Sequence, residues 1–273
     1  YQDHRGDSRV PYPRFLKPRS LAEALGQLAM TSDCHPLAGG TDLLVTLHAG
    51  QSTPAALLDI WSLEELKGVR EVDGAIEVGA AESYTHIMQS PLVNRYVPAL
   101  AQAARTIGAA QIQNRGTLGG NLGTASPAGD TLPVMLAADA AIVTDRRIVP
   151  ASEFFVGYRK TALEPDELIV AIRFPRNGRT IRFRKVGTRQ AQAISKVVMA
   201  VSREPARVAI GSVAEVPLRA AHAEAALERG DVEEAVEAVA RDIRPIDDVR
   251  STASYRRRVT QNVLRRLLDE DRA

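Results

Sequence analysis

The stretch from Thr106 to Asp130 constrains the fold of this chain more than any other part of the sequence. Six of the 19 glycines lie between Gly108 and Gly129. Glycine tolerates backbone angles and close approaches that other residues do not. We therefore expect a loop that touches a ligand. An apolar helical pattern resumes at 132–138, so this loop lies between ordered elements, which disfavours the alternative of a plain surface loop.

Small polar groups accompany these glycines. Thr117 and Asn121 offer a hydroxyl and an amide, and the successive N–H groups of Gly119 and Gly120 can converge into an anion-binding nest. The stretch contains no lysine, and the chain lacks the GxxxxGK[ST] pattern of a mononucleotide P-loop. Neutral donors of this kind suit the diphosphate of a large bound cofactor. The simpler alternative is that Thr117 only caps a turn or helix.

A second, smaller loop of the same type lies upstream. Residues 35–38 are expected to form a short strand, Gly39 to Asp42 a turn, and residues 43–47 a helix that Asp42 caps. A strand, a glycine pair and a helix start together present free N–H groups to a phosphate. The pattern is not GxGxxG, so a Rossmann site is not indicated. Thr41 has the same simpler alternative as Thr117, a turn residue.

Composition narrows the functional class. A hydrophobic fraction of 45% and a charged fraction of 25% are ordinary for a soluble globular protein. There is no apolar run of ~18 residues, and residues 1–10 lack the apolar core of a signal peptide, so we expect no membrane span and a cytoplasmic location. The net charge of +2 does not indicate a nucleic-acid partner. The arginine clusters at 146–147, 182–184 and 256–258 are expected on solvated faces or subunit contacts.

Residues for metal binding or covalent catalysis do not stand out. The single Cys34 cannot ligate an iron–sulfur cluster, and the five histidines show no zinc-binding spacing. No nucleophile motif or pair of carboxylates appears, so we predict no catalytic residue and no metal site. Redox chemistry, if present, has to come from a bound cofactor.

Periodicity and turn signals divide the chain into four parts: a loose extension at 1–10, a βαβ-like subdomain at 11–60, an α+β subdomain at 61–176, and a C-terminal α+β subdomain at 177–273. The first contains a capping box at Ser20, and the second a hairpin at Asp73-Gly74. The last is predicted to contain three antiparallel strands followed by three helices.

Four segments in this order resemble the FAD-binding subunit of the molybdenum hydroxylases, the xanthine dehydrogenase and carbon monoxide dehydrogenase family. They are Ala38-Gly39-Gly40-Thr41-Asp42-Leu43, the stretch from Thr117 to Asp130, Phe154-Phe155-Val156-Gly157-Tyr158-Arg159-Lys160-Thr161, and residues 185–197. The resemblance implies a two-part FAD-binding domain of the vanillyl-alcohol oxidase type, followed by the C-terminal α+β subdomain.

The resemblance also implies roles for individual residues. Leu37, Ala38, Gly39, Gly40, Thr41, Asp42 and Leu43 would wrap the diphosphate and ribose of FAD, and Thr117, Gly119, Gly120 and Asn121 would hold the diphosphate from the other side. Asp130 would lie near the adenosine half of FAD, and as an alternative or in addition it caps the helix at 132. Ile107 and Ile169 would contact the cofactor. Lys185 and Lys196 would flank the segment over the flavin, with a surface ion pair as the alternative for Lys196. Tyr158 and Arg159 would shape the site of an electron acceptor; alternatively they are packing residues of a loop.

In such a complex, a large subunit holds molybdopterin and hydroxylates the substrate. Electrons pass through two [2Fe-2S] clusters on a small subunit to the FAD of this chain, and then to NAD+, oxygen or a quinone. Two alternatives stay open: a stand-alone flavin oxidase or dehydrogenase, and a regulatory nucleotide-binding module without redox function.

Overall fold

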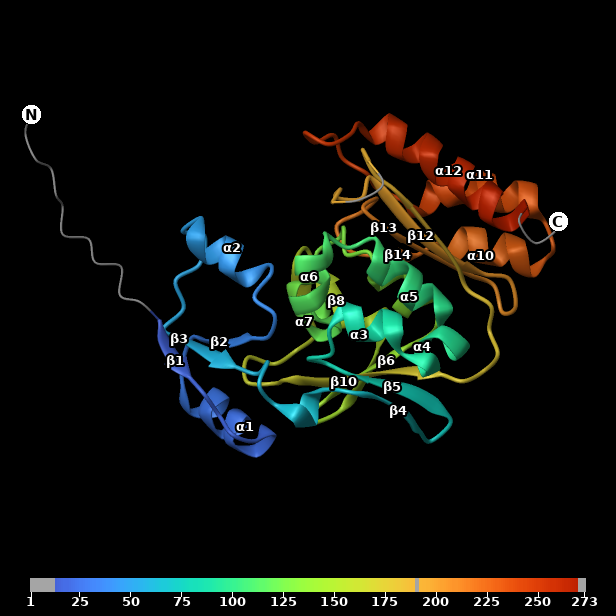
Figure 1. Cartoon of the computed structure of the whole chain (residues 1–273). Coiled ribbons are helices and arrows are strands. Elements are labelled where there is room, and N and C mark those ends of the chain that lie inside the picture. The colour runs from blue at the N-terminus through green and yellow to red at the C-terminus, as the bar shows by residue number, and fades with distance from the viewer. Residues whose placement is uncertain (1–12, 190–191, 270–273) are drawn as a thin grey trace, which may run out of the picture.

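The computed structural model describes residues 13–189 and 192–269. In this part of the chain three main sheets and their covering helices form an α+β fold, as predicted (Figure 1). The extension predicted at 1–10 lies outside the described residues. Within them, no helix is both long and apolar enough to cross a membrane.

The first sheet is parallel, with strand order β1-β3-β2. Its crossovers are helices α1 and α2, which lie on opposite sides of the sheet in Figure 1. At the predicted capping box, the Ser20 Oγ accepts a hydrogen bond from the Glu23 N–H at 3.2 Å. The apolar face of α1 packs on the sheet, whereas α2 buries no residue. The elements are β1 (Arg14–Leu16), α1 (Leu21–Met30), β2 (Cys34–Leu37), α2 (Leu43–His48) and β3 (Ala56–Asp59).

The second sheet is antiparallel, in the order β4-β5-β10-β6-β7. Asp73 and Gly74, both at positive φ, form the predicted hairpin turn between β4 and β5. Its strands are β4 (Val69–Val72), β5 (Ala75–Gly79), β6 (Ala141–Thr144), β7 (Ile148–Pro150) and β10 (Ile169–Pro175). Shorter elements surround it: η1 (Glu64–Leu66), α3 (Tyr84–Gln89), α4 (Pro91–Tyr96), α5 (Pro98–Arg105), α9 (Ala151–Phe154), and the small hairpin of β8 (Phe155–Gly157) and β9 (Lys160–Thr161).

The glycine-rich stretch is not the continuous loop that we predicted. It forms helices α6 (Ala110–Arg115) and α7 (Leu118–Thr124), and α8 (Leu132–Ala137) follows. Glycine disfavours helix interiors, but Gly119 has a packing reason to be there. A Cβ at Gly119 would lie 2.6 Å from the Ala80 carbonyl oxygen. The glycines therefore let α7 pack directly on the chain that leaves β5.

The C-terminal sheet has four antiparallel strands rather than the predicted three. The additional strand, β14, is two residues long, too short to produce a detectable alternation. The three predicted helices are present and cover one face of this sheet (Figure 1). The elements are β11 (Arg182–Val186), β12 (Val197–Ser202), β13 (Arg207–Gly211), β14 (Leu218–Arg219), α10 (Ala221–Glu228), α11 (Val232–Asp242) and α12 (Ala253–Asp269).

Asp139 joins the second and C-terminal parts of the chain. Its carboxylate pairs with Arg179, Arg207 and Arg219 at 2.8, 3.0 and 3.2 Å. Partial burial by itself would raise the pKa of Asp139, but the hydrogen bonds from Arg207 and Arg179 outweigh it and lower that pKa. Asp139 follows α8, so this cluster fixes the helix after the glycine-rich stretch to the C-terminal sheet.

Candidate functional site: a cofactor cleft between three sheets

A cleft of about 1530 Å³ lies where the three parts of the chain meet. It is larger than the ~300–1,000 Å³ of most small-molecule pockets. Fifteen of the sixteen residues predicted to bind a cofactor line it: Leu37, Ala38, Gly39, Gly40, Thr41, Asp42, Leu43, Ile107, Thr117, Gly119, Gly120, Asn121, Asp130, Ile169 and Lys185. The structure therefore gathers residues that are up to 148 positions apart, from Leu37 to Lys185, around one space.

The β2–α2 loop, residues 38–42, leaves hydrogen-bond donors open. Within the described protein, the backbone N–H groups of Gly39, Gly40 and Thr41 donate to no acceptor. Backbone donors without a partner are rare unless water or a ligand satisfies them. A short run of such donors at the wall of a large cleft is suited to binding phosphate oxygens.

Backbone packing explains both glycines of this loop. A Cβ at Gly39 would lie 1.7 Å from the carbonyl oxygen of Arg115, and Gly40 adopts φ +74°. The loop therefore lies directly against the end of α6. Asp42 does not cap α2 as predicted, because its side chain makes no capping bond. The carboxylate instead accepts from Arg159 Nη1 at 3.3 Å and from Thr124 Oγ1 at 3.4 Å.

The start of α7 differs from the β2–α2 loop, because its donors are already in use. Thr117 Oγ1 accepts from the Gly120 N–H at 3.0 Å, and the Gly119 N–H donates to the Ala80 carbonyl at 2.9 Å. The nest predicted at Gly119 and Gly120 is therefore wrong, and the capping role weighed as the alternative for Thr117 is present. These residues still line the cleft, but their N–H groups already donate to protein acceptors.

Asp130 and Lys185 form a buried ion pair in the cleft wall. The Lys185 Nζ lies 2.5 Å from Asp130 Oδ2 and 2.9 Å from the Thr106 carbonyl oxygen. Burial raises the pKa of Asp130, and the Lys185 charge opposes that shift only in part. Asp130 Oδ1 is buried without a hydrogen-bond partner. The predicted helix-capping role of Asp130 is absent, since Thr131 occupies the N-cap position of α8.

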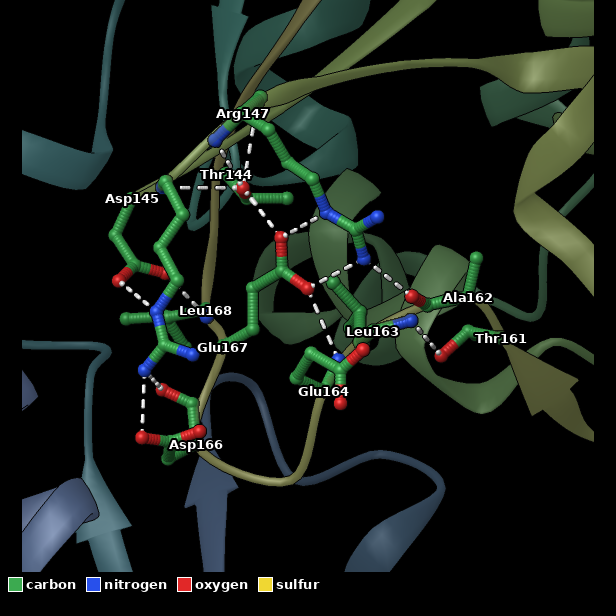
Figure 2. Close-up of polar contacts among 11 residues, drawn as sticks. Thr144, Asp145, Arg147, Thr161, Ala162, Leu163, Glu164, Asp166, Glu167 and Leu168 are labelled. Atoms are coloured by element: carbon green, nitrogen blue, oxygen red, sulfur yellow. Dashed lines mark hydrogen bonds and ion pairs between the residues drawn. The ribbon is translucent and has the colours of Figure 1, made fainter.

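A polar network holds the segment 161–168 that leads into Ile169 (Figure 2). The Glu167 carboxylate accepts from Arg147 Nε and Nη2, from Thr144 Oγ1 and from the Glu164 N–H, at 2.7 to 2.9 Å. The Arg147 hydrogen bonds, opposed in part by burial, lower the pKa of Glu167 to about 2. Because these hydrogen bonds are all made within the protein, the network supports the cleft wall and leaves few polar groups free to bind a ligand.

Comparison with known proteins identifies the family. The model named FAD binding domain in molybdopterin dehydrogenase matches residues 10–177, and the CO dehydrogenase flavoprotein C-terminal domain matches residues 182–271. The chain belongs to the molybdopterin dehydrogenase FAD-binding family. The family resemblance seen in the four sequence segments is thereby confirmed.

Two relatives of this FAD-binding chain align along nearly their whole length. The xanthine dehydrogenase FAD-binding subunit of Escherichia coli O157:H7 is 30% identical, with 95% of this chain and 96% of the relative covered. The carbon monoxide dehydrogenase medium chain of Hydrogenophaga pseudoflava is 33% identical over 94% of this chain and 96% of its own length. A solved structure of carbon monoxide dehydrogenase from H. pseudoflava superposes with a TM-score of 0.89 at 32% identity, covering 94% and 96% of the two chains.

The residues of the cleft fit FAD. The open N–H groups of Gly39, Gly40 and Thr41 match a diphosphate, and the unpartnered Asp130 Oδ1 can accept a hydrogen bond from a hydroxyl or N–H of the cofactor. The cleft volume accommodates a dinucleotide. The described part of the chain has no cluster of three or more His, Cys, Asp or Glu side chains that could hold a metal ion.

Lys196 is the one predicted binding residue that does not line the cleft. Its ammonium lies over the Tyr255 ring, 4.9 Å from the centroid, and it makes no ion pair with a described residue. The surface ion pair weighed as its alternative role is therefore not present among the described residues, and the role near the flavin stays a prediction. The segment predicted to cover the flavin continues through residues 190 and 191, which lie outside the described residues.

The C-terminal part contributes further cleft residues: Ser195 lies in the segment predicted to cover the flavin, whereas Ser212 and Arg256 were not predicted. The Ser195 hydroxyl lies 3.0 Å from that of Ser212, and Arg256 donates to the Ser212 carbonyl at 2.6 Å and to Asp248 at 2.7 Å. Arg256 was expected on a solvated face or in a subunit contact, but it is only 5% exposed within this chain. Its spacing to Thr260 and Val263 places it on the buried stripe of α12. That periodicity could have predicted its burial.

Proposed function

We propose that this chain is the FAD-binding electron-transfer subunit of a molybdopterin-dependent hydroxylase or dehydrogenase complex. It takes electrons from [2Fe-2S] clusters of a small partner subunit and passes them to NAD+ or another acceptor, while a large subunit carries the molybdopterin. The observation that supports this most is the run of open N–H groups at Gly39, Gly40 and Thr41 in the wall of the cleft. The names of the relatives, FAD-binding subunit and medium chain, support the partner arrangement.

Each part of the cleft has a separate task in this proposal. The N–H groups of the β2–α2 loop bind the diphosphate. Asp130, fixed by Lys185, accepts a hydrogen bond from the cofactor through Oδ1. Ile107 and Ile169 provide apolar contacts. Bound FAD supplies the ability to exchange electrons both singly and in pairs, while the protein supplies binding, orientation and electrostatics.

An absorption spectrum of the purified chain with added FAD tests this function. We expect flavin bands that stay with the protein on gel filtration and that bleach on photoreduction. Bleaching by NADH under anaerobic conditions would identify NAD+ as the acceptor. Retained flavin that neither light nor NADH reduces would contradict the redox function and favour a nucleotide-binding module.

A second test addresses the partners. Mixed with the iron–sulfur and molybdopterin subunits of its complex, the FAD-loaded chain should be reduced when the substrate of the large subunit is added. Reduction by an organic substrate without any partner would instead indicate a stand-alone oxidase or dehydrogenase. The cytoplasmic location expected from the sequence stays a prediction.

A further inference from the structure

The cations that line the cleft are not equivalent. Among the described residues, Lys and Arg contribute five: Arg159, Lys185, Arg244, Arg250 and Arg256. Lys185 is paired with Asp130, and both Arg250 and Arg256 contact Asp248. Arg244 donates to backbone carbonyls. Arg159 alone among these five pairs with a residue of the β2–α2 loop, through Asp42.

Arg159 reaches this loop from the tip of the β8–β9 hairpin, which contacts both sides of the cleft. On one side, Arg159 Nη1 lies 3.3 Å from Asp42 Oδ2, across 117 residues of sequence. On the other side, the Tyr158 N–H donates to Glu215 Oε1 of the C-terminal part at 3.0 Å. Arg159 adopts φ +52°, a conformation that is uncommon for a residue with a side chain. The hairpin tip is thus held in place across the cleft.

The position of the Arg159 guanidinium beside the β2–α2 loop matters for the electrostatics of anion binding. A diphosphate on the N–H groups of Gly39 to Thr41 would lie beside the Asp42 carboxylate, and residues 38–42 contain no lysine or arginine. The negative charges of the diphosphate and the Asp42 carboxylate would repel each other, and a cation close to both would offset that repulsion. The Arg159–Asp42 contact is a single long ion pair with both side chains 40–47% exposed. A guanidinium held this loosely has donors left for phosphate oxygens.

We propose that Arg159 is the counter-ion of the cofactor diphosphate, and that the Asp42 carboxylate holds its guanidinium at the β2–α2 loop until the diphosphate competes for it. The proposal rests on FAD binding in this cleft, as proposed above. It assigns to the hairpin tip a binding role in addition to any contact with an electron acceptor. It also explains why a carboxylate is present in a loop whose donors face an anion.

The Arg159→Ala variant of the full chain tests this directly. We expect its affinity for FAD to fall about tenfold, since a hydrogen bond to a charged group contributes about that factor. ADP, which contains the diphosphate, should lose a similar factor, and riboflavin, which lacks it, should lose none. Raising the salt concentration should weaken FAD binding less in the variant than in the wild type. Flavin fluorescence and calorimetric titration measure these affinities.

The Arg229→Ala variant is a matched control. Arg229 is also an exposed arginine in one ion pair with a carboxylate, Glu234, but it does not line the cleft. This variant should bind FAD like the wild type. Asp42→Asn should act in the opposite direction to Arg159→Ala, because it removes a repelling charge and releases Arg159 to the phosphates. We expect FAD to bind equally well or more tightly in that variant.

Two outcomes would overturn the inference: unchanged FAD and ADP affinity in Arg159→Ala, or equal losses for riboflavin and FAD, which would indicate a general disturbance of the cleft. A tenfold weakening by Asp42→Asn would also contradict it. Failure of the proposed function is distinguishable, because it would appear in the wild-type protein, either as no FAD binding or as bound flavin that neither light nor NADH reduces. The role of Arg159 is tested separately, by the ratio of FAD affinities between the Arg159→Ala variant and the wild type.

Discussion

The two glycine pairs of the cleft have similar sequences and different structural roles. Gly39-Gly40 and Gly119-Gly120 both precede or begin a short helix, and both contain a glycine packed against a backbone carbonyl. The first pair leaves its N–H groups open to the cleft. The second uses them on Thr117 and Ala80. One pair is therefore available to a ligand, and the other builds part of the cleft wall.

This difference shows what glycine content can and cannot predict. A glycine pair indicates that the backbone is unusually close to something. Whether that something is a ligand or the protein itself depends on where each N–H donates. Open donors predict an effect of substitution on cofactor affinity, whereas used donors predict an effect on stability. Substitutions at both kinds of position therefore test that separation.

Substitution in the buried Asp130–Lys185 pair tests the part of the cleft wall whose polar groups bond to one another. Lys185→Met leaves the Asp130 carboxylate buried without its partner, so we expect the free energy of unfolding to fall by ~3–5 kcal/mol. Chemical denaturation measures this. Lys67→Met is the control, because the Lys67–Glu64 pair is much more exposed and should contribute less than ~1 kcal/mol. A loss of the same small size in Lys185→Met would show that the buried pair does not support the fold.

Gly119→Ala tests the packing of α7. Its Cβ would meet the Ala80 backbone at 2.6 Å, so we expect a loss of about 3 kcal/mol in unfolding free energy. Gly123 lies in the same helix with nothing within 4 Å of its Cβ position. Gly123→Ala should therefore stabilise the protein by ~0.5–1 kcal/mol. If both variants had the same stability, the close contact of α7 with Ala80 would be disproved.

Acid titration tests the Glu167 network. The pKa of Glu167 is about 2 in the folded protein and 4.5 for an unperturbed glutamate. A lowered folded-state pKa stabilises the protein above the unperturbed value, and that stabilisation is lost as the pH falls from 4.5 toward 2. We expect the unfolding free energy of wild type to exceed that of Glu167→Gln by about 3 kcal/mol at neutral pH, because each pH unit between the two pKa values contributes about 1.4 kcal/mol. The difference should vanish near pH 2. A constant difference at all pH values would contradict the assigned pKa, and the exposed Glu64→Gln serves as control.

Thr117 and Thr41 provide the most direct comparison of the two loops. Thr117→Ala removes the α7 cap, so unfolding free energy should fall by ~1 kcal/mol. Thr41 makes no side-chain hydrogen bond to a described residue, so Thr41→Ala should change stability by less than ~0.5 kcal/mol but weaken FAD binding. Thermal unfolding of the apo protein and FAD titration measure the two effects. If Thr41→Ala lowered the stability and Thr117→Ala did not, the free donors of the β2–α2 loop and the used donors at the start of α7 would be wrongly assigned.

Local signals in the sequence predicted much of the fold. The Ser20 cap, the Asp73-Gly74 turn and the C-terminal helices depend on nearby residues, and each is present. Strand β14 was missed because two residues carry no periodicity. The helices within the glycine-rich stretch were missed because packing on Ala80 overrides the low helix propensity of glycine.

The candidate site was likewise predictable in part from the sequence. Family motifs identified fifteen cleft-lining residues, including the open loop at Gly39. The side-chain partners were not predictable from motifs. Arg159 meets Asp42 and Lys185 meets Asp130 only after three parts of the chain have packed together. The unused donors of the β2–α2 loop likewise become visible only when every nearby acceptor is placed.

Amide hydrogen exchange, followed residue by residue by NMR, is the most direct test that the β2–α2 loop binds the cofactor. Exchange rates are compared in the apo protein and with saturating FAD. We predict that FAD slows exchange at Gly39, Gly40 and Thr41, whose N–H groups have no protein acceptor among the described residues. Exchange at Gly119 and Gly120, whose N–H groups are already hydrogen-bonded, should change little. Unchanged exchange at Gly39, Gly40 and Thr41 in the presence of bound FAD would contradict it.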